Sequence, residues 1–98
     1  MDNFGPTELA EVEVSIVVPL FNEQDNLRPL YQQLIESLAT AYNYELIFVD
    51  DGSTDKSYVV LTDLAKRDPK VRVIRFRKNF GQTAALSAGF DHARGKII

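Results

Sequence analysis

Three short segments of the chain combine acidic, hydroxyl-bearing or basic side chains with a proline or a glycine. They read PLFNE at residues 19–23, DDGSTD at residues 50–55 and RKNFGQT at residues 77–83. Carboxylates can hold a metal ion or accept hydrogen bonds from a ligand, and basic residues beside a glycine at a helix start can bind an anion. The three segments are therefore the first candidates for a binding site.

The segment DDGSTD is either an ordinary strand-to-helix turn or a turn whose acids hold a ligand. A turn explains residues 52–55, because the glycine permits a positive φ, Ser53 or Thr54 can cap the next helix and the last carboxylate faces the helix dipole. It leaves Asp50 and Asp51 unexplained, since two adjacent carboxylates repel each other. Consecutive strand residues point to opposite faces, so this pair is poorly placed to chelate one metal ion. Accepting hydrogen bonds from a nucleobase or a ribose is the more economical role.

The other two segments also have two interpretations each. PLFNE places Pro19, Phe21 and Glu23 at a strand exit, where they either end the strand and cap a helix or line a pocket for a planar base. RKNFGQT places Lys78 just before Gly81 at a helix start. The free N–H groups and the dipole of such a helix favour phosphate, and ordinary solvated surface side chains are the alternative.

Apolar β-branched runs with little polar alternation predict strands that are covered on both faces, as in a parallel sheet. Two such runs, VSIVVPLF and YELIFVD, lead into the first two segments. The run VRVIRF alternates instead, so Arg72 and Arg75 are expected to face solvent and the strand to lie nearer an edge. Between and after these runs, apolar residues recur at helical spacing, which predicts amphipathic helices. We expect strands near residues 14–19, 45–50 and 71–76 and helices near residues 25–41, 54–67 and 81–93.

This alternation predicts an α/β fold with a three-layer, Rossmann-like parallel sheet and right-handed crossovers. A fourth strand is expected to begin at Lys96. Residues 1–13 are acidic and lack an apolar core, and we expect them to form a flexible lead-in to a domain at residues 14–98. In an open parallel sheet, ligands bind outside the carboxyl ends of the strands, which is where the three segments converge.

The composition excludes several classes of protein. The 98 residues carry a net charge of −3, which argues against binding of nucleic acid or anionic lipid through the overall field. There is no cysteine, hence no disulfide and no thiolate metal site, and the cytoplasm is the default compartment. No apolar run approaches the ~20 residues of a membrane helix. No dinucleotide-binding, Walker, zinc-protease or hydrolase motif occurs.

The segments VSIVVPLFNEQDNL, ELIFVDDGSTDKS and NFGQTAALSAGFDHARGKII follow one another between about Val14 and Ile98. Together they resemble the family 2 glycosyltransferases of GT-A fold, and among them the polyprenyl-phosphate glycosyltransferases of the dolichol-phosphate mannose synthase and bactoprenol glucosyltransferase types. The resemblance implies that residues 14–98 are the N-terminal, nucleotide-sugar-binding half of a GT-A domain. It also implies that Asp51 holds the base. The residues that it places around the nucleotide are Pro19, Phe21, Glu23, Val49 and Asp51, and those on the diphosphate side are Lys78 and Gly81.

The family's next strand runs into an Asp-x-Asp metal motif, which this chain does not contain. The resemblance therefore implies a Mg²⁺ or Mn²⁺ cofactor whose ligands lie outside this chain, and neither a catalytic nor a metal-binding residue within it.

The implied function of the full-length protein is transfer of a sugar from a UDP- or GDP-sugar to a polyprenyl or dolichyl phosphate at the cytoplasmic face of the membrane. Membrane contact is expected only through parts outside this chain, no nucleic acid is expected as a partner, and the 98-residue chain alone is expected to be inactive. The alternative is a non-catalytic α/β module that binds a nucleotide or a partner.

Overall fold

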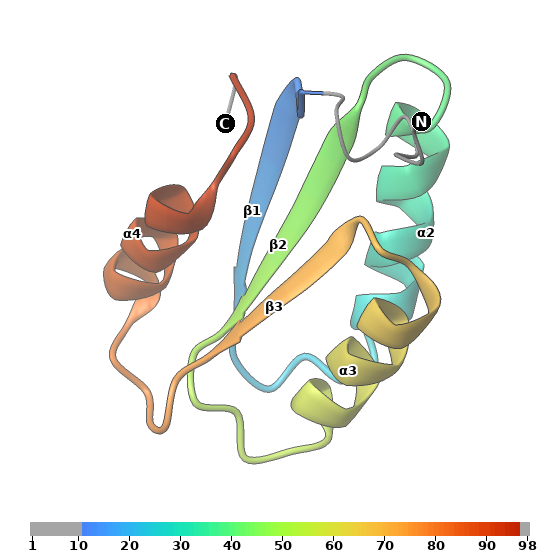
Figure 1. Ribbon diagram of the computed structural model, residues 1–98. Helices are drawn as coiled ribbons and strands as arrows, with labels where there is room; N and C mark the ends of the chain where they lie inside the picture. Colours follow the sequence, from blue (N-terminus) through green and yellow to red (C-terminus); the bar gives the residue numbers. More distant parts are fainter. Residues whose placement is uncertain (1–10, 97–98) are drawn as a thin grey trace.

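The computed structural model describes residues 11–96, which form three strands and three helices (Figure 1). The three strands and three helices expected with bounds are all present, and each helix lies within its expected range, the second one ending at residue 67 as expected. Lys96, where a fourth strand is expected to begin, lies in a bend and not in a strand. None of these helices is long and apolar enough to cross a membrane. In chain order the elements are β1 (Val14–Leu20), α2 (Leu27–Leu38), β2 (Tyr44–Asp50), α3 (Ser57–Arg67), β3 (Val71–Arg75) and α4 (Gln82–His92).

The last residues of the expected lead-in pair with the loop before β2. The Glu13 N–H donates to the Asn43 carbonyl over 2.7 Å, and Asn43 Nδ2 donates to the Glu11 carbonyl over 2.6 Å. Residues 11–13 are thus bonded to the domain. The rest of the lead-in and the end of the expected fourth strand, residues 97–98, lie outside the described residues.

The strands form one sheet in the order β1-β2-β3, and both pairings are parallel. The register ends with Leu20 opposite Asp50 and Asp50 opposite Arg75. The three strands therefore end side by side, which brings the loops that follow them to one edge of the sheet (Figure 1). The predicted parallel sheet is confirmed.

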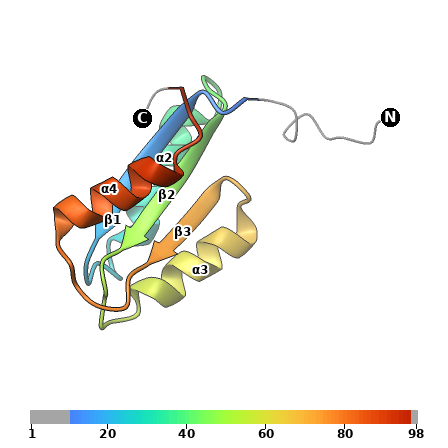
Figure 2. The same ribbon diagram turned by 60° about the vertical axis from the view of Figure 1, so that its left-hand side comes forward.

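Helices cover both faces of the sheet, which confirms the predicted three layers. α2 and α3 lie on one face and α4 on the other (Figure 2). β2 is the central strand and is buried along its whole length. Its side chains alternate, so that Leu46 and Phe48 belong to the core under α2 and α3, whereas Ile47 and Val49 pack with Ala85 of α4.

α4 lies close to β1 because its inner face carries small residues. Gly89 is buried in the helix, and a Cβ at this position would overlap the side chain of Val17. A larger residue at position 89 would push α4 away from the sheet and displace the loop that leads into it.

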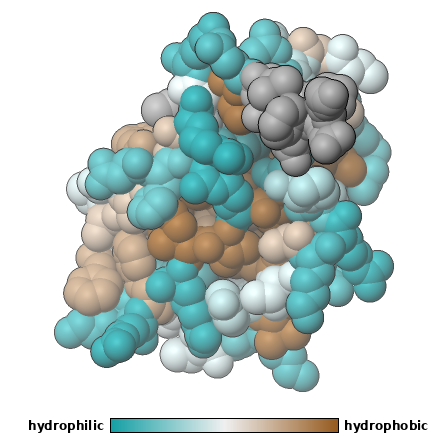
Figure 3. Space-filling model, in the orientation of Figure 1, coloured by the Kyte–Doolittle hydropathy of each residue, from teal (hydrophilic) through white to brown (hydrophobic). Residues whose placement is uncertain are grey.

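The outer edge of β3 has no strand partner among the described residues. β3 is the front strand in Figure 1, and the same view in space-filling form shows hydrophobic surface in the middle of this face, surrounded by hydrophilic side chains (Figure 3). The core is therefore only partly covered at this edge.

A buried carboxylate ties the segment after α4 to the amino end of the sheet. Glu45 is 1% exposed and accepts hydrogen bonds from Ser15 Oγ over 2.7 Å and Arg72 Nη1 over 2.9 Å. It also accepts the Arg94 N–H over 2.7 Å and Arg94 Nε over 3.0 Å. Burial by itself would raise the pKa of Glu45, but these hydrogen bonds outweigh it and lower the pKa from 4.5 to about 2. Arg72 is thus held in an ion pair, and its expected solvent-facing position is wrong.

Replacing Glu45 by glutamine should destabilise the domain by about 3 kcal/mol at pH 7, because Arg72 and Arg94 lose the carboxylate between them. Since the folded-state pKa of Glu45 lies below its unfolded value, the carboxylate stabilises the native state fully above about pH 4.5, and this contribution is lost as the pH falls towards 2. In urea unfolding, the free energies of the wild-type protein and the Glu45→Gln variant should differ most near neutral pH and converge in acid.

Glu36, on the exposed side of α2, offers a matched Glu→Gln control. Its replacement should change the free energy of unfolding by less than about 0.5 kcal/mol. If the destabilisation of Glu45→Gln stayed constant between neutral pH and pH 3, Glu45 would not act through its charge.

Candidate functional site

Three loops meet at the carboxyl edge of the sheet (Figure 1). The first loop, residues 21–26, follows β1, the second, residues 51–56, follows β2, and the third, residues 76–81, follows β3. They contain most of the three polar segments that the sequence singles out. The hydrogen bonds between these loops determine where each candidate side chain lies.

Asn22 joins the first loop to the second. Its φ is 54°, a left-handed conformation that asparagine adopts more readily than most residues. Its Oδ1 accepts the N–H groups of Thr54 over 2.8 Å and of Asp55 over 3.2 Å. Its own N–H donates to Ser53 Oγ over 2.9 Å. The second loop thus holds the turn of the first through both backbone and side-chain groups.

Further hydrogen bonds extend this junction towards α3. The Glu23 N–H donates to Ser57 Oγ over 2.9 Å, and the Gln24 N–H donates to Asp55 Oδ2 over 3.3 Å. In return, Gln24 Oε1 accepts the Lys56 N–H over 2.8 Å. Every residue from 22 to 24 is therefore bonded to the second loop or to the first residue of α3, which makes the two loops one unit.

The N-terminus of α3 differs from the expected one. The helix begins at Ser57, whose N–H donates to Asp55 Oδ1 over 2.8 Å. The expected cap at Ser53 or Thr54 is wrong, because both hydroxyls accept hydrogen bonds from Asn22 instead. Desolvation raises the pKa of Asp55, but hydrogen bonds from Ser57 and from backbone N–H groups outweigh it and hold the pKa below its usual 3.8. The Asp55 carboxylate thus stays charged, and it accepts hydrogen bonds both from the first residue of α3 and from Gln24 in the first loop.

Asp51 joins the second loop to the third. It is 4% exposed, and both of its carboxylate oxygens are used. Oδ1 accepts the Phe80 N–H over 2.7 Å, and Oδ2 accepts the Gly81 N–H over 3.0 Å. Asn79 Nδ2 also donates to the Asp51 carbonyl over 3.3 Å. Asp51 therefore positions the backbone that leads into α4.

Gly52 allows the third loop to come this close. Its φ is 75°, and a Cβ at this position would overlap the backbone of Lys78 and Asn79. A side chain at position 52 would strain the turn and also force the second and third loops apart.

Asp50 forms a hydrogen bond within the second loop and not with the third loop. It is fully buried, and its Oδ1 accepts the Ser53 N–H over 2.9 Å. Its Oδ2 has no hydrogen-bond partner among the described residues. The two adjacent carboxylates thus have separate partners. Residues 11–96 contain no group of three or more His, Cys, Asp or Glu side chains that could hold a metal ion.

A depression of about 290 Å³ lies between the first loop, the second loop and the start of α4. Four of the five residues expected around a nucleotide line it, so the fold brings them to one surface. The residues that form its wall are Pro19, Leu20, Phe21, Glu23, Asp51 and Gln82.

The remaining expected residues lie elsewhere. Val49 is fully buried and packs with Ile47 and Ala85, so it does not reach the depression. Lys78 is exposed, with Nζ 5.3 Å from the centre of the Phe80 ring. Gly81 precedes α4 with a φ of 104°, and its N–H already donates to Asp51. That N–H is not available to an anion in this arrangement.

Gln82 is a lining residue that the sequence reasoning did not select. It is the first residue of α4, and the N-terminus of this helix lies at the carboxyl edge of the sheet. The signal was its position after a glycine that starts a helix, because such a residue lies where ligands of parallel sheets bind.

The depression offers hydrogen-bond acceptors beside an aromatic ring. Glu23 and Asp51 carry carboxylates, and the Gln82 amide can donate and accept. Phe21 is 43% exposed and presents a π face. No basic residue lines the wall. A planar heterocycle with N–H donors, such as a nucleobase, fits this combination.

Curated relatives of the chain are named as sugar transferases. A glycosyltransferase of Bacillus subtilis (strain 168), YkcC, is 44% identical over 88 residues, which cover 89% of this chain and 27% of the relative. A dodecaprenyl-phosphate galacturonate synthase of Rhizobium johnstonii is 42% identical over 89 residues, which cover 89% of this chain and 26% of the relative. The chain thus spans about a quarter of the length of these relatives.

Among solved structures, the chain is similar to the mannosyltransferase PcManGT from Pyrobaculum calidifontis, which was solved in complex with GDP-Man and Mn²⁺. The TM-score is 0.76 at 22% sequence identity, and the match covers 91% of this chain and 27% of that one. The likeness confirms the expected GT-A fold class. The model of the family described as glycosyl transferase family 2 matches residues 15–98. The chain therefore belongs to glycosyl transferase family 2.

Proposed function

We propose that the protein containing this chain transfers a sugar from a nucleoside diphosphate sugar to a polyprenyl phosphate, and that this chain supplies the nucleotide-binding part. The main support for the proposal is that Pro19, Phe21, Glu23 and Asp51 line one and the same depression in a chain of glycosyl transferase family 2. The name of the Rhizobium relative supports a polyprenyl phosphate as the acceptor. The donor sugar and the base, uracil or guanine, are left open.

In this proposal the base lies against Phe21 and donates hydrogen bonds to carboxylates. The oxygens of Asp51 already accept one backbone N–H each, but a carboxylate oxygen has a second lone pair. Asp51 can therefore bind the base while it holds the third loop. Glu23 and Gln82 supply further polar contacts. Val49 would act from the core, by fixing the end of the strand that leads into Asp51.

The diphosphate would lie towards the start of α4. The first N–H groups of a helix lack partners within the helix, and the positive end of its dipole favours an anion. Since the Gly81 N–H is taken by Asp51, we assign the anion contact to the N–H groups that follow and to Lys78. Lys78 is exposed and can reach a ligand without losing an ion pair within residues 11–96.

A divalent cation would neutralise the leaving diphosphate, and the Mn²⁺ in the complex of PcManGT makes Mg²⁺ or Mn²⁺ the natural proposal for the whole protein. The described residues do not fit such an ion. Asp50 and Asp51 bond to separate backbone groups, and no third ligand stands beside them. We therefore propose that the metal ligands lie outside this chain, that the whole protein works at the cytoplasmic face of a membrane, and that residues 1–98 alone transfer no sugar.

The Asp51→Asn variant of the whole protein should bind its nucleotide more weakly by roughly 1 to 3 kcal/mol, because hydrogen bonds to a charged acceptor are lost. Calorimetric titrations with UDP and with GDP measure the effect and identify the base. Asp63→Asn makes the same chemical change in a surface ion pair of α3 with Arg28, and should leave both affinities unchanged.

Unchanged affinity of Asp51→Asn for both nucleotides would remove Asp51 from the site. The enzymatic part of the proposal is tested separately, by following transfer of labelled sugar to a polyprenyl phosphate by the whole protein with Mg²⁺ or Mn²⁺. Nucleotide binding without any transfer would favour the non-catalytic module.

A further inference from the structure

A second depression at the same edge of the sheet has the opposite chemistry. It measures about 300 Å³ and is lined by Ser53, Arg75, Phe76 and Arg77. It shares no residue with the depression assigned to the nucleotide. The first depression carries two carboxylates and no basic residue, whereas the second carries two guanidinium groups and no acid. The two cannot favour the same chemical group.

The two arginines around the second depression, Arg75 and Arg77, form no ion pair with another residue that the structure describes. The Arg75 guanidinium carbon lies 4.1 Å from the centre of the Tyr58 ring, a stacking contact that orients the group and leaves its N–H donors free. Ser53 Oγ accepts the Asn22 N–H, so its hydroxyl hydrogen can still donate to a ligand.

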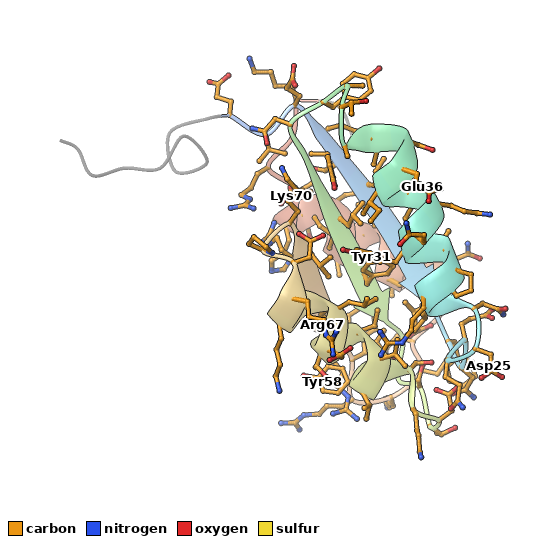
Figure 4. The ribbon with its side chains drawn as sticks, turned by 90° about the vertical axis from the view of Figure 1, so that its right-hand side faces the viewer. Asp25, Tyr31, Glu36, Tyr58, Arg67 and Lys70 are labelled. Atoms are coloured by element: carbon orange, nitrogen blue, oxygen red, sulfur yellow. The ribbon has the colours of Figure 1, made fainter. Side chains whose placement is uncertain are left out.

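The charge pattern of the chain concentrates basic residues here. Residues 69–90 contain five basic and no acidic residues, while the rest of the chain contains six basic and fourteen acidic ones. Two of the five have structural partners near the amino end of the sheet: Lys70 with Asn43 and Tyr44, and Arg72 with Glu45. Figure 4 shows Tyr58 and Lys70 towards opposite ends of the sheet. The basic residues left at the carboxyl edge, Arg75, Arg77 and Lys78, form no ion pair through their side chains among residues 11–96.

Two guanidinium groups and a hydroxyl around one hollow match the oxygen atoms of a phosphate group. Guanidinium forks bind phosphate through pairs of charge-assisted hydrogen bonds, which are stronger than hydrogen bonds between neutral groups. We propose that the depression lined by Ser53, Arg75, Phe76 and Arg77 is a phosphate-binding site, separate from the nucleotide depression. The phosphate would belong either to a lipid headgroup or to a small soluble ligand.

Calorimetric titrations of the whole protein distinguish the two sources. One arm uses inorganic phosphate, and the other uses dihexanoyl phosphatidic acid below its micelle concentration, with dihexanoyl phosphatidylcholine as the lipid control, all at matched ionic strength. We expect saturable binding in at least one arm, and a double variant, Arg75→Gln with Arg77→Gln, that binds at least ~tenfold more weakly. Binding in the lipid arm alone identifies a headgroup site, and binding in both arms identifies a site for phosphate itself.

Lys66→Gln is the matched control, because it removes an exposed positive charge in the last turn of α3. It should leave phosphate binding unchanged. Arg75→Lys with Arg77→Lys keeps the charges but removes the planar forks, so its affinity should fall between those of the wild type and the glutamine variant. If circular dichroism shows that the glutamine variant is unfolded, the affinity of this lysine variant for phosphate tests the proposal in its place.

Three results would overturn the proposal. The first is no saturable binding in either arm, and the second is an equal loss of binding in the Lys66→Gln control, which would indicate general charge attraction only. The third is a loss of UDP affinity in the arginine variants, which would make this surface part of the nucleotide site. The proposal does not depend on the nucleotide assignment, because Glu23→Gln changes a residue that lines only the nucleotide depression and should bind phosphate like the wild type.

Discussion

The segment that follows β2 holds the whole carboxyl edge of the domain together. Its hydroxyls, backbone N–H groups and the Asp55 carboxylate bond to residues 22–24 of the first loop, and the Asp51 carboxylate bonds to two N–H groups of the third loop. Gly52 lets the third loop pass without a steric clash. These contacts join residues about thirty positions apart in the sequence. Because β2 is the central strand and is buried along its whole length, the segment is anchored to the core of the fold.

This arrangement explains how the edge carries two surfaces of opposite charge. The first and second loops, joined at Asn22, place the carboxylates of Glu23 and Asp51 on one wall. The third loop is held at Asp51, and Arg77 of this loop lines the second depression together with Arg75, the last residue of β3. Ser53 contributes to the second surface while its oxygen supports the first loop. A change in the second loop should therefore affect both surfaces.

The fold was largely predictable because its signals are local. Apolar β-branched runs and helical spacing indicate the strands and helices, and the rule that ligands bind at the carboxyl edge of a parallel sheet indicates the site. The failures have a common physical cause. A residue type that can cap a helix, such as Thr54, can also form a hydrogen bond to another loop. An arginine in an alternating strand, such as Arg72, can either face solvent or pair with a buried acid such as Glu45. A pattern along the chain cannot distinguish these alternatives, because the deciding partner lies far away in the sequence. Val49 shows the same limit, since its neighbour Asp51 reaches the loops while Val49 faces the core under α4.

Asp51 holds the third loop through the N–H groups of Phe80 and Gly81. Amide hydrogen exchange at these two positions, measured by nuclear magnetic resonance in wild type and Asp51→Asn, tests it most directly. We expect exchange at least ~tenfold faster at both positions in the variant, with the amides of β2 unchanged, because a charged acceptor is replaced by a neutral amide that can accept only one of the two hydrogen bonds. Equal exchange rates at Phe80 and Gly81 in the two proteins would contradict it.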